Sequence, residues 1–239
     1  MEIIRLKEVN STNEYVKEYS RDLKDETVVY AERQTTGHGR LGRFWVDTGE
    51  DNLFMTLFLK PFDELIPLYS NFTQYLSVVL ANILEKEYGL TPKIKWPNDV
   101  LIDGAKIAGI LSECTTQGGK FTGLALGLGV NLNTSPENLA KIDKPAASIY
   151  SLTGIKIDRE IFLQKLLTEF FLLYDKFKAV GFLSVKESYT KRADFLGKNI
   201  SINVLGQIHE GKAIEITDEG ALVLIENSQR KVYFMGDIL

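Results

Sequence analysis

The sequence predicts an α+β fold followed by a small C-terminal β-barrel. Segments whose apolar residues recur at helical spacing lie among short runs rich in Val, Ile, Leu and aromatic residues, which are typical of strands. After Phe195 the helical pattern ends and only short strand-like runs remain. Apolar residues make up 44% and charged residues 25% of the 239-residue chain, an ordinary globular composition. We therefore expect a main domain at residues 1–192 and a smaller domain at residues 193–239.

Local signals place the elements of the main domain. Ser11 and Glu14 have the spacing of a helix capping box, Gly89 is a typical helix end, and Asp158 is a typical helix start. The expected strands lie at 3–6, 27–31, 53–59, 93–96, 100–102, 107–114 and 121–130. The expected helices lie at 11–21, 71–88, 158–178 and 181–192, with an irregular segment at 132–145.

The strands of the smaller domain are short and separated by turn residues. They are expected at 200–204, 209–216, 221–225 and 231–234. A β-barrel of fewer than about 50 residues is marginally stable on its own. We therefore expect this barrel to pack against the main domain.

Charge and residue counts exclude several classes of protein. The net charge of −4 provides no global basic field for binding nucleic acid. The single cysteine, Cys114, cannot form an intrachain disulfide, and with only His38 and His209 a Cys/His zinc site is nearly excluded. A carboxylate site for Mg²⁺ stays open. We expect Cys114 to be a buried thiol and His209 to have no partner.

No apolar stretch has the pattern of a targeting or membrane segment. The N-terminus carries Glu2, Arg5 and Lys7 where a signal peptide would have an apolar region. The most apolar run is far shorter than the roughly 20 residues of a transmembrane helix. These observations predict a cytoplasmic protein with no membrane partner.

The strongest candidate for a binding loop is Gln34-Thr35-Thr36-Gly37-His38-Gly39-Arg40-Leu41-Gly42-Arg43-Phe44-Trp45. Its glycines allow close approach of the backbone to a ligand, and consecutive N–H groups can form an anion-binding nest. Arg40 and Arg43 add forked donors suited to phosphate or carboxylate, and Trp45 adds a flat face suited to an adenine. The formal match to G-x-G-x-x-G is weak because no helix start follows it. A solvated surface loop is the alternative.

Three further stretches place polar groups where predicted strands begin or end. Lys95-Trp96-Pro97-Asn98-Asp99 presents a lysine, an amide and a carboxylate at a proline turn. Lys106 opens an otherwise apolar strand, where it either enters a pocket or extends to solvent. Gly127-Leu128-Gly129-Val130-Asn131 thins a strand and ends it with an amide, and the alternative for its glycines is helix–sheet packing.

In their order and spacing, these stretches resemble the biotin–protein ligases (biotin–[acetyl-CoA-carboxylase] ligases) over essentially the whole chain. The resemblance is carried by Ser11-Thr12-Asn13, Gly37 to Arg43, Lys95 to Asp99, Lys106 with Gly109-Ile110, and Gly127 to Asn131. It implies a mixed β-sheet flanked by helices, related to the cores of class II aminoacyl-tRNA synthetases, and a C-terminal SH3-like barrel. The DNA-binding domain of some members would precede Ser11, where there is no room for it. The chain thus resembles the short form, and we expect no DNA partner.

Two positions depart from the family pattern. His38 stands where many members have arginine. Because its glycine neighbours indicate a backbone role there, we expect the change to be tolerated. The chain ends at Leu239, where some relatives continue with a basic residue that helps to hold ATP.

The implied reaction has two steps and uses ATP, biotin and Mg²⁺. The ligase first adenylates biotin to biotinyl-5′-AMP and then transfers biotin to a lysine in the biotin carboxyl-carrier domain of a carboxylase. Lys106 and Arg40 are the implied catalytic residues, because cations must offset the repulsion between two anions. The implied biotin-binding residues are Ser11, Thr12, Asn13, Gln34, Gly37, His38, Gly39, Arg40, Lys106, Gly109 and Ile110. The implied ATP-binding residues are Arg40, Arg43, Trp45, Lys95, Asn98, Lys106 and Asn131. No metal ligands are assigned.

Two alternatives stay open. A lipoate–protein ligase has a related fold and related chemistry, but lipoyl lacks a ureido group, so a polar ring-binding pocket favours biotin. A non-catalytic biotin or nucleotide sensor would bind without releasing pyrophosphate. A homodimer through the glycine-rich strands at 105–130 and a monomer are both compatible with the sequence.

Overall fold

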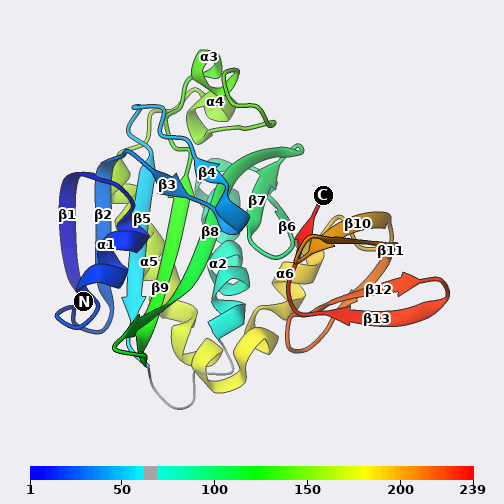
Figure 1. The fold of residues 1–239 in the computed structure, drawn as a ribbon. Helices are drawn as coiled ribbons and strands as arrows, with labels where there is room; N and C mark the ends of the chain where they lie inside the picture. The colour runs from blue at the N-terminus through cyan, green and yellow to red at the C-terminus, as the bar shows by residue number, and fades with distance from the viewer. Residues whose placement is uncertain (62–68) are drawn as a thin grey trace.

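The computed structural model describes residues 1–61 and 69–239, and its largest unit is a seven-stranded mixed sheet (Figure 1). The strand order is β1-β2-β5-β9-β8-β7-β6; β1 and β2 are parallel and the other neighbours are antiparallel. The mixed sheet implied by the resemblance is therefore confirmed. The strands are β1 (Glu2–Val9), β2 (Thr27–Gln34), β5 (Leu53–Leu59), β6 (Lys93–Lys95), β7 (Asp99–Ile102), β8 (Ala105–Gln117) and β9 (Lys120–Val130).

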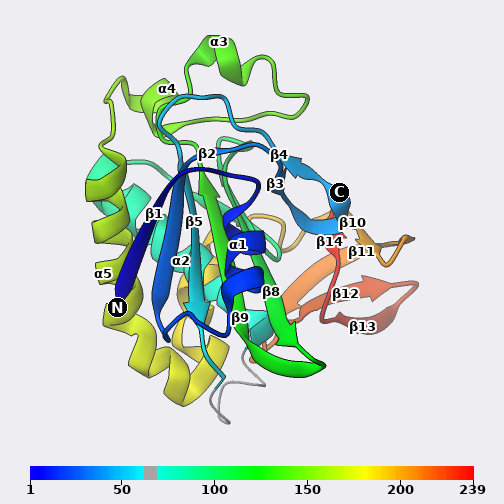
Figure 2. The same cartoon turned by 60° about the vertical axis from the view of Figure 1, so that its left-hand side comes forward.

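Helices cover both faces of this sheet (Figure 2). The helix α1 (Thr12–Tyr19) packs on one face, where Val16 joins a small apolar cluster with Val29 and Phe58. The long helices α2 (Phe72–Tyr88) and α5 (Arg159–Val180) cover the other face and build the main core. Neighbouring residues such as Val28 and Val29 belong to the two different clusters, as the two-residue period of a strand requires. No helix in the described residues is long and apolar enough to cross a membrane.

Two of the three helix ends predicted from local capping residues are confirmed. Gly89 adopts a left-handed conformation and closes α2, and the Asp158 side chain accepts hydrogen bonds from two backbone N–H groups at the start of α5. The predicted capping bond of Ser11 is wrong, because its side chain makes no cap hydrogen bond. Instead, the side-chain oxygen of Gln34 accepts from the backbone N–H of Thr12, so a distant residue satisfies the first donor of α1.

The C-terminal strands form a separate antiparallel sheet that packs against the main domain, as predicted. Gly220, in its turn between β11 and β12, accepts hydrogen bonds from the Trp96 indole and the Gln74 amide. The strand order is β13-β12-β11-β10-β14, and barrel closure stays a prediction. The strands are β10 (Asn199–Val204), β11 (Gln207–Ile216), β12 (Leu222–Glu226), β13 (Gln229–Tyr233) and β14 (Asp237–Ile238).

Several shorter elements differ from the sequence prediction. The segment expected as one helix at 181–192 is a 3-10 turn, η3 (Gly181–Ser184), followed by α6 (Lys186–Arg192). The region expected to be irregular holds α3 (Pro136–Leu139), and α4 (Ile149–Thr153) was not predicted; a capping box at Ser148 starts α4. The binding loop forms β3 (Gly37–His38), η1 (Arg40–Gly42) and β4 (Phe44–Trp45).

Both predictions about isolated reactive side chains were wrong. Cys114 is exposed, because burial along its side of β8 declines from Ile110 toward the hairpin turn. His209 has a partner, since its Nδ1 atom lies 3.0 Å from the Tyr233 hydroxyl. Tyr233 comes from a strand two positions away in the sheet, so no local pattern could indicate this contact.

Candidate active site

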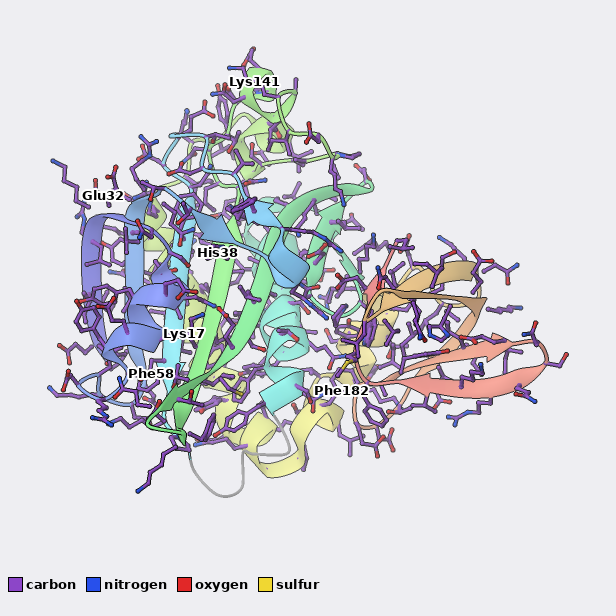
Figure 3. The ribbon with its side chains drawn as sticks, in the orientation of Figure 1. Lys17, Glu32, His38, Phe58, Lys141 and Phe182 are labelled. Carbon is purple, nitrogen blue, oxygen red and sulfur yellow. The ribbon has the colours of Figure 1, made fainter. Side chains whose placement is uncertain are left out.

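A cavity of about 610 Å³ opens beside the β3–β4 loop, between the main sheet and the C-terminal residues. Figure 3 shows His38 on this loop, in front of the sheet. Of the site residues proposed from the sequence, Gly37 alone does not line the cavity among the residues that the structure describes. The other predicted residues line it together: Ser11, Thr12, Asn13, Gln34, His38, Gly39, Arg40, Arg43, Trp45, Lys95, Asn98, Lys106, Gly109, Ile110 and Asn131.

Neutral polar groups line the side of the cavity next to α1. The Gln34 side-chain oxygen accepts from the Thr12 backbone N–H at 2.8 Å and from the Thr12 hydroxyl at 3.2 Å. These two bonds fix the Gln34 amide with its NH₂ group left to donate. Ser11 is buried, and its hydroxyl makes no hydrogen bond within residues 1–61 and 69–239. The arrangement offers a hydroxyl and an amide donor to a small polar ligand.

Both polar atoms of the Asn13 side-chain amide already have hydrogen-bond partners within the protein. Its NH₂ group donates to the Leu111 carbonyl at 3.2 Å and to Glu113 at 2.8 Å, and its oxygen accepts from Thr56 at 2.6 Å. Gly127 makes room for it, because a Cβ there would overlap the Asn13 amide oxygen. These contacts favour a positioning role for Asn13, which holds α1 against the sheet beside the cavity.

Trp45 lies in a slot made by two paired glycines. Gly109 and Gly129 are register partners on β8 and β9. A Cβ on Gly129 would lie 2.7 Å from Trp45 Cε2, and one on Gly109 would lie 2.9 Å from Trp45 Cζ3. Such distances are well below van der Waals contact, so only glycine admits the indole here. The Lys106 ammonium lies 5.4 Å from the indole centroid, within cation–π range.

Gly37 supports the same loop from outside the cavity. A Cβ there would lie 2.8 Å from the Trp45 carbonyl oxygen and 2.9 Å from the Gln34 side-chain nitrogen. Gly37 pairs with Trp45 across the two short strands. The absence of a side chain thus lets the loop fold closely over Gln34.

The cationic side of the cavity is organised by two aspartates. Lys106 Nζ lies 2.7 Å from Asp99. Arg43 lies 2.8 Å from Asp237, and the Arg40 Nε atom lies 3.5 Å from the same carboxylate. Arg40 also donates to the Gly236 carbonyl at 3.2 Å. The arginine loop is therefore tied to the C-terminal end of the chain, on the far side of the cavity.

Burial and neighbouring cations act on Lys95. Burial lowers the pKa of its ammonium, and the charge of Asp99 raises it. The nearby charges of Lys144, Arg43 and Lys106 lower the Lys95 pKa further, so the net shift is downward. A bound anion would stabilise this crowded set of cations.

The amides of Asn98 and Asn131 brace the backbone around Lys106. The Asn98 NH₂ donates to the Ile110 carbonyl at 2.8 Å, and the Asn131 NH₂ donates to the Ala147 carbonyl at 3.0 Å. Both amide oxygens stay available as acceptors from a ligand, because neither accepts a hydrogen bond in the described part of the chain.

Two cavity walls were missed at the level of sequence. One is the segment at 142–146, and the other is the C-terminal stretch Asp237–Leu239. The first reads as an irregular polar loop and the second as the end of a strand-rich domain. No local pattern signals that either one reaches a cavity built by distant residues.

Comparison with known proteins finds two family models that match this chain. The model of the biotin/lipoate A/B protein ligase family matches residues 6–131, and that of the biotin protein ligase C-terminal domain matches residues 195–239. A bifunctional ligase/repressor BirA of Bacillus subtilis is 32% identical over 213 residues, covering 89% of this chain and 65% of that protein. The chain thus spans slightly less than two thirds of this relative.

Two further relatives match along nearly their full length. A biotin–[acetyl-CoA-carboxylase] ligase of Paracoccus denitrificans is 33% identical over 235 residues, with 95% of each chain covered. The structure of a biotin protein ligase from Aquifex aeolicus, in complex with biotin and ATP, aligns with a TM-score of 0.85 at 29% identity. That alignment covers 100% of this chain and 97% of the Aquifex chain.

Proposed function

The chain belongs to the biotin/lipoate A/B protein ligase family, and we propose that it is an ATP-dependent biotin ligase. In the first step the biotin carboxylate attacks the α-phosphorus of ATP, the bond to the bridging oxygen breaks, and pyrophosphate leaves. In the second step a lysine amine of a carrier protein attacks the carbonyl carbon of biotinyl-5′-AMP, and AMP leaves. The acceptor proposed here is the carboxyl-carrier domain of a carboxylase, in keeping with the names of the relatives.

One observation carries this proposal: a single cavity has a neutral polar side and a cationic side. Its volume of about 610 Å³ lies within the usual range for small-molecule sites. The donors of Ser11 and Gln34 suit a urea carbonyl, and the polar site disfavours a lipoyl ring, which lacks that group. The cationic side suits a carboxylate and phosphates. The two reactants can thus lie next to each other with their reacting groups at the boundary.

The first step brings two anions together, and the cations of the cavity would offset their repulsion. We assign Lys106 to the bridge between the biotin carboxylate and the α-phosphate, with Arg40 beside it. Asp99 holds Lys106 in place at 2.7 Å before substrate binds. Arg43 and Arg40 would exchange Asp237 for phosphate oxygens as ATP enters. Such preorganised charges act strongly in a site from which water is excluded.

The nucleotide would lie against the other predicted residues. The indole of Trp45 offers a flat face, and Asn98 and Asn131 offer free amide oxygens to an adenine amino group. Closure of the loop would protect the mixed anhydride from hydrolysis.

Magnesium enters this proposal as part of the substrate MgATP. Within the described residues no three His, Cys, Asp or Glu side chains group to hold a metal. Asp99 and Asp237 in the cavity are already paired with cations. Mg²⁺ prefers phosphate oxygens and water with few protein ligands, so this donor set fits an ion delivered by ATP. The ion would neutralise phosphate charge.

Pyrophosphate release tests the proposal. Purified protein is supplied with MgATP and either biotin or lipoate, and release is compared between wild type and Lys106→Ala. Release that requires biotin and collapses in the variant supports the ligase and the role of Lys106. Release that requires lipoate would reassign the chain to the lipoate branch of the family. Biotin binding without release would indicate a sensor.

A further inference from the structure

The segment at 142–146 places a lysine at the mouth of the cavity. Its anchor is Lys106 itself: the Lys106 N–H donates to the Pro145 carbonyl at 2.9 Å, and the Ala147 N–H donates to the Lys106 carbonyl at 2.9 Å. A parallel bridge between Lys106 and Ala146 completes the attachment. Lys144 precedes this anchor directly, so its backbone is held close to that of the lysine assigned to the reaction.

The cations around the cavity fall into two groups. Lys106, Arg40 and Arg43 each have an aspartate partner. Lys95 and Lys144 have no ion pair with any residue in the described ranges 1–61 and 69–239, and both line the cavity. The two unpaired ammonium groups are close enough for the charge of Lys144 to lower the pKa of Lys95. Together they form a site that an anion would stabilise.

Lys106 and Lys144 differ in solvent exposure, which indicates different roles. Lys106 has a side chain that is 34% exposed, whereas Lys144, which also lines the cavity, belongs to the exposed class. Pyrophosphate must leave before the second step, while the adenylate must stay bound until a carrier lysine arrives. Contacts to the leaving part of ATP are therefore expected where the cavity opens to solvent.

We propose that Lys144 binds the β- and γ-phosphates of ATP, the part of the nucleotide that leaves as pyrophosphate. The proposal rests on the proposed ligase function and adds a residue to its ATP site. Asp143, also in the cavity lining, is the nearest carboxylate in sequence and lowers the net positive charge there. The lysine acts as a binding residue for the leaving group.

Calorimetric binding of a non-hydrolysable ATP analogue and of AMP tests this assignment. Lys144→Ala should weaken the binding of the analogue about tenfold, equal to about 1.4 kcal/mol, because one charge-assisted contact is lost. AMP affinity should stay unchanged, and Lys144→Arg should retain most of the analogue affinity. Equal affinity of Lys144→Ala and wild type for the analogue would overturn the proposal, and so would an equal loss for AMP.

Lys141, directly before this segment, provides a matched control (Figure 3). It is also exposed, but it lies 2.6 Å from the Asn138 side-chain oxygen and does not line the cavity. Lys141→Ala changes the net charge equally and should bind the analogue like wild type. If both variants weaken binding equally, the effect is one of general charge, and the assignment fails.

Turnover separates this proposal from the proposed function. In the reverse reaction, Lys144→Ala should raise the KM for pyrophosphate, while transfer of biotin from purified biotinyl-5′-AMP to a carrier should keep its rate. Wild-type protein that binds the analogue but shows no biotin-dependent pyrophosphate release would refute the ligase function, and the comparison of variants would still decide the role of Lys144. Wild type that binds no nucleotide would refute both.

Discussion

Two glycines on the same side of β9 should respond very differently to replacement by alanine. Gly127 faces the buried amide of Asn13, and Gly129 faces the indole of Trp45. In Gly127→Ala the new Cβ would overlap the Asn13 oxygen, and moving Asn13 breaks its bonds to Leu111, Glu113 and Thr56. At about 1 kcal/mol for each of these three bonds, the loss is about 3 kcal/mol. The melting temperature should then fall by roughly 6–12 °C.

Gly129→Ala should leave the fold largely intact and damage the site. The new Cβ would lie 2.7 Å from Trp45 Cε2, while carbon atoms in contact settle at about 3.5–4.0 Å, so the indole must move by about 1 Å. Trp45 is only half-buried and its neighbour Phe44 is exposed, so the loop can yield for about 1 kcal/mol. A displacement of about 1 Å at a reacting site can slow chemistry by about 10²-fold.

Thermal unfolding by circular dichroism and the rate of biotin-dependent pyrophosphate release test this pair. We expect Gly127→Ala to lose stability and Gly129→Ala to lose rate at a nearly native melting temperature. A Gly127→Ala variant that melts within about 2 °C of wild type, a shift worth less than about 1 kcal/mol, would contradict the role given to Asn13. A Gly129→Ala variant that keeps the full rate would contradict the role given to Trp45.

Three further changes follow from the contacts of the site and of the C-terminal sheet. Lys106→Ala should slow pyrophosphate release by about 10²–10³-fold, because the lost contact acts in the transition state, and should lower the melting temperature only slightly, since its ion pair with Asp99 is partly exposed and screened; a normal rate would remove Lys106 from the mechanism. Asp237→Ala should lower the free energy of unfolding by about 1 kcal/mol in a urea titration, since its partners Arg43 and Arg40 are 46% and 24% exposed and both pairs are screened by solvent; an increase in stability would contradict the loop anchor. For Glu226, burial raises the pKa, but the hydrogen bond from Tyr233 and the pairing with Lys231 outweigh burial and lower the pKa below its ordinary 4.5. The unfolded state then binds more protons, so this stabilisation is fully present above pH 4.5 and is lost as the pH falls through the lowered folded pKa. Melting temperatures measured below pH 5 should therefore fall more steeply for wild type than for Glu226→Gln, and parallel curves would refute the assignment.

Local features were predictable from neighbouring residues. Gly89 ends α2 and Asp158 caps α5, because a left-handed glycine and a carboxylate N-cap act within one turn of the chain. The turn at Asp103-Gly104, an Asp-Gly pair typical of β-hairpins, has both residues at positive φ.

Contacts between distant segments were not predictable in this way. Ser11 has the pattern of a capping residue, yet Gln34, 22 residues from Thr12, takes the first donor of α1. Cys114 lies in a strand that the sequence predicts to be apolar, but the side chain is exposed because it stands near the turn of the β8–β9 hairpin, where burial declines. Gln34 was assigned to ligand binding on the resemblance, and its second role in holding α1 needed the fold.

The residue types along the chain indicate which side chains could carry chemistry: a glycine–arginine loop, a lysine at the start of a strand, and amides at strand ends. Their chemical types and spacings do not depend on packing. Their partners follow from the folded arrangement of distant segments. It placed Asp237 beside Arg43, 194 residues earlier, and it attached the segment of Lys144 to the backbone of Lys106. Hydrogen bonds and charges act over a few ångströms in space, and the packing of one sheet against another sets those distances.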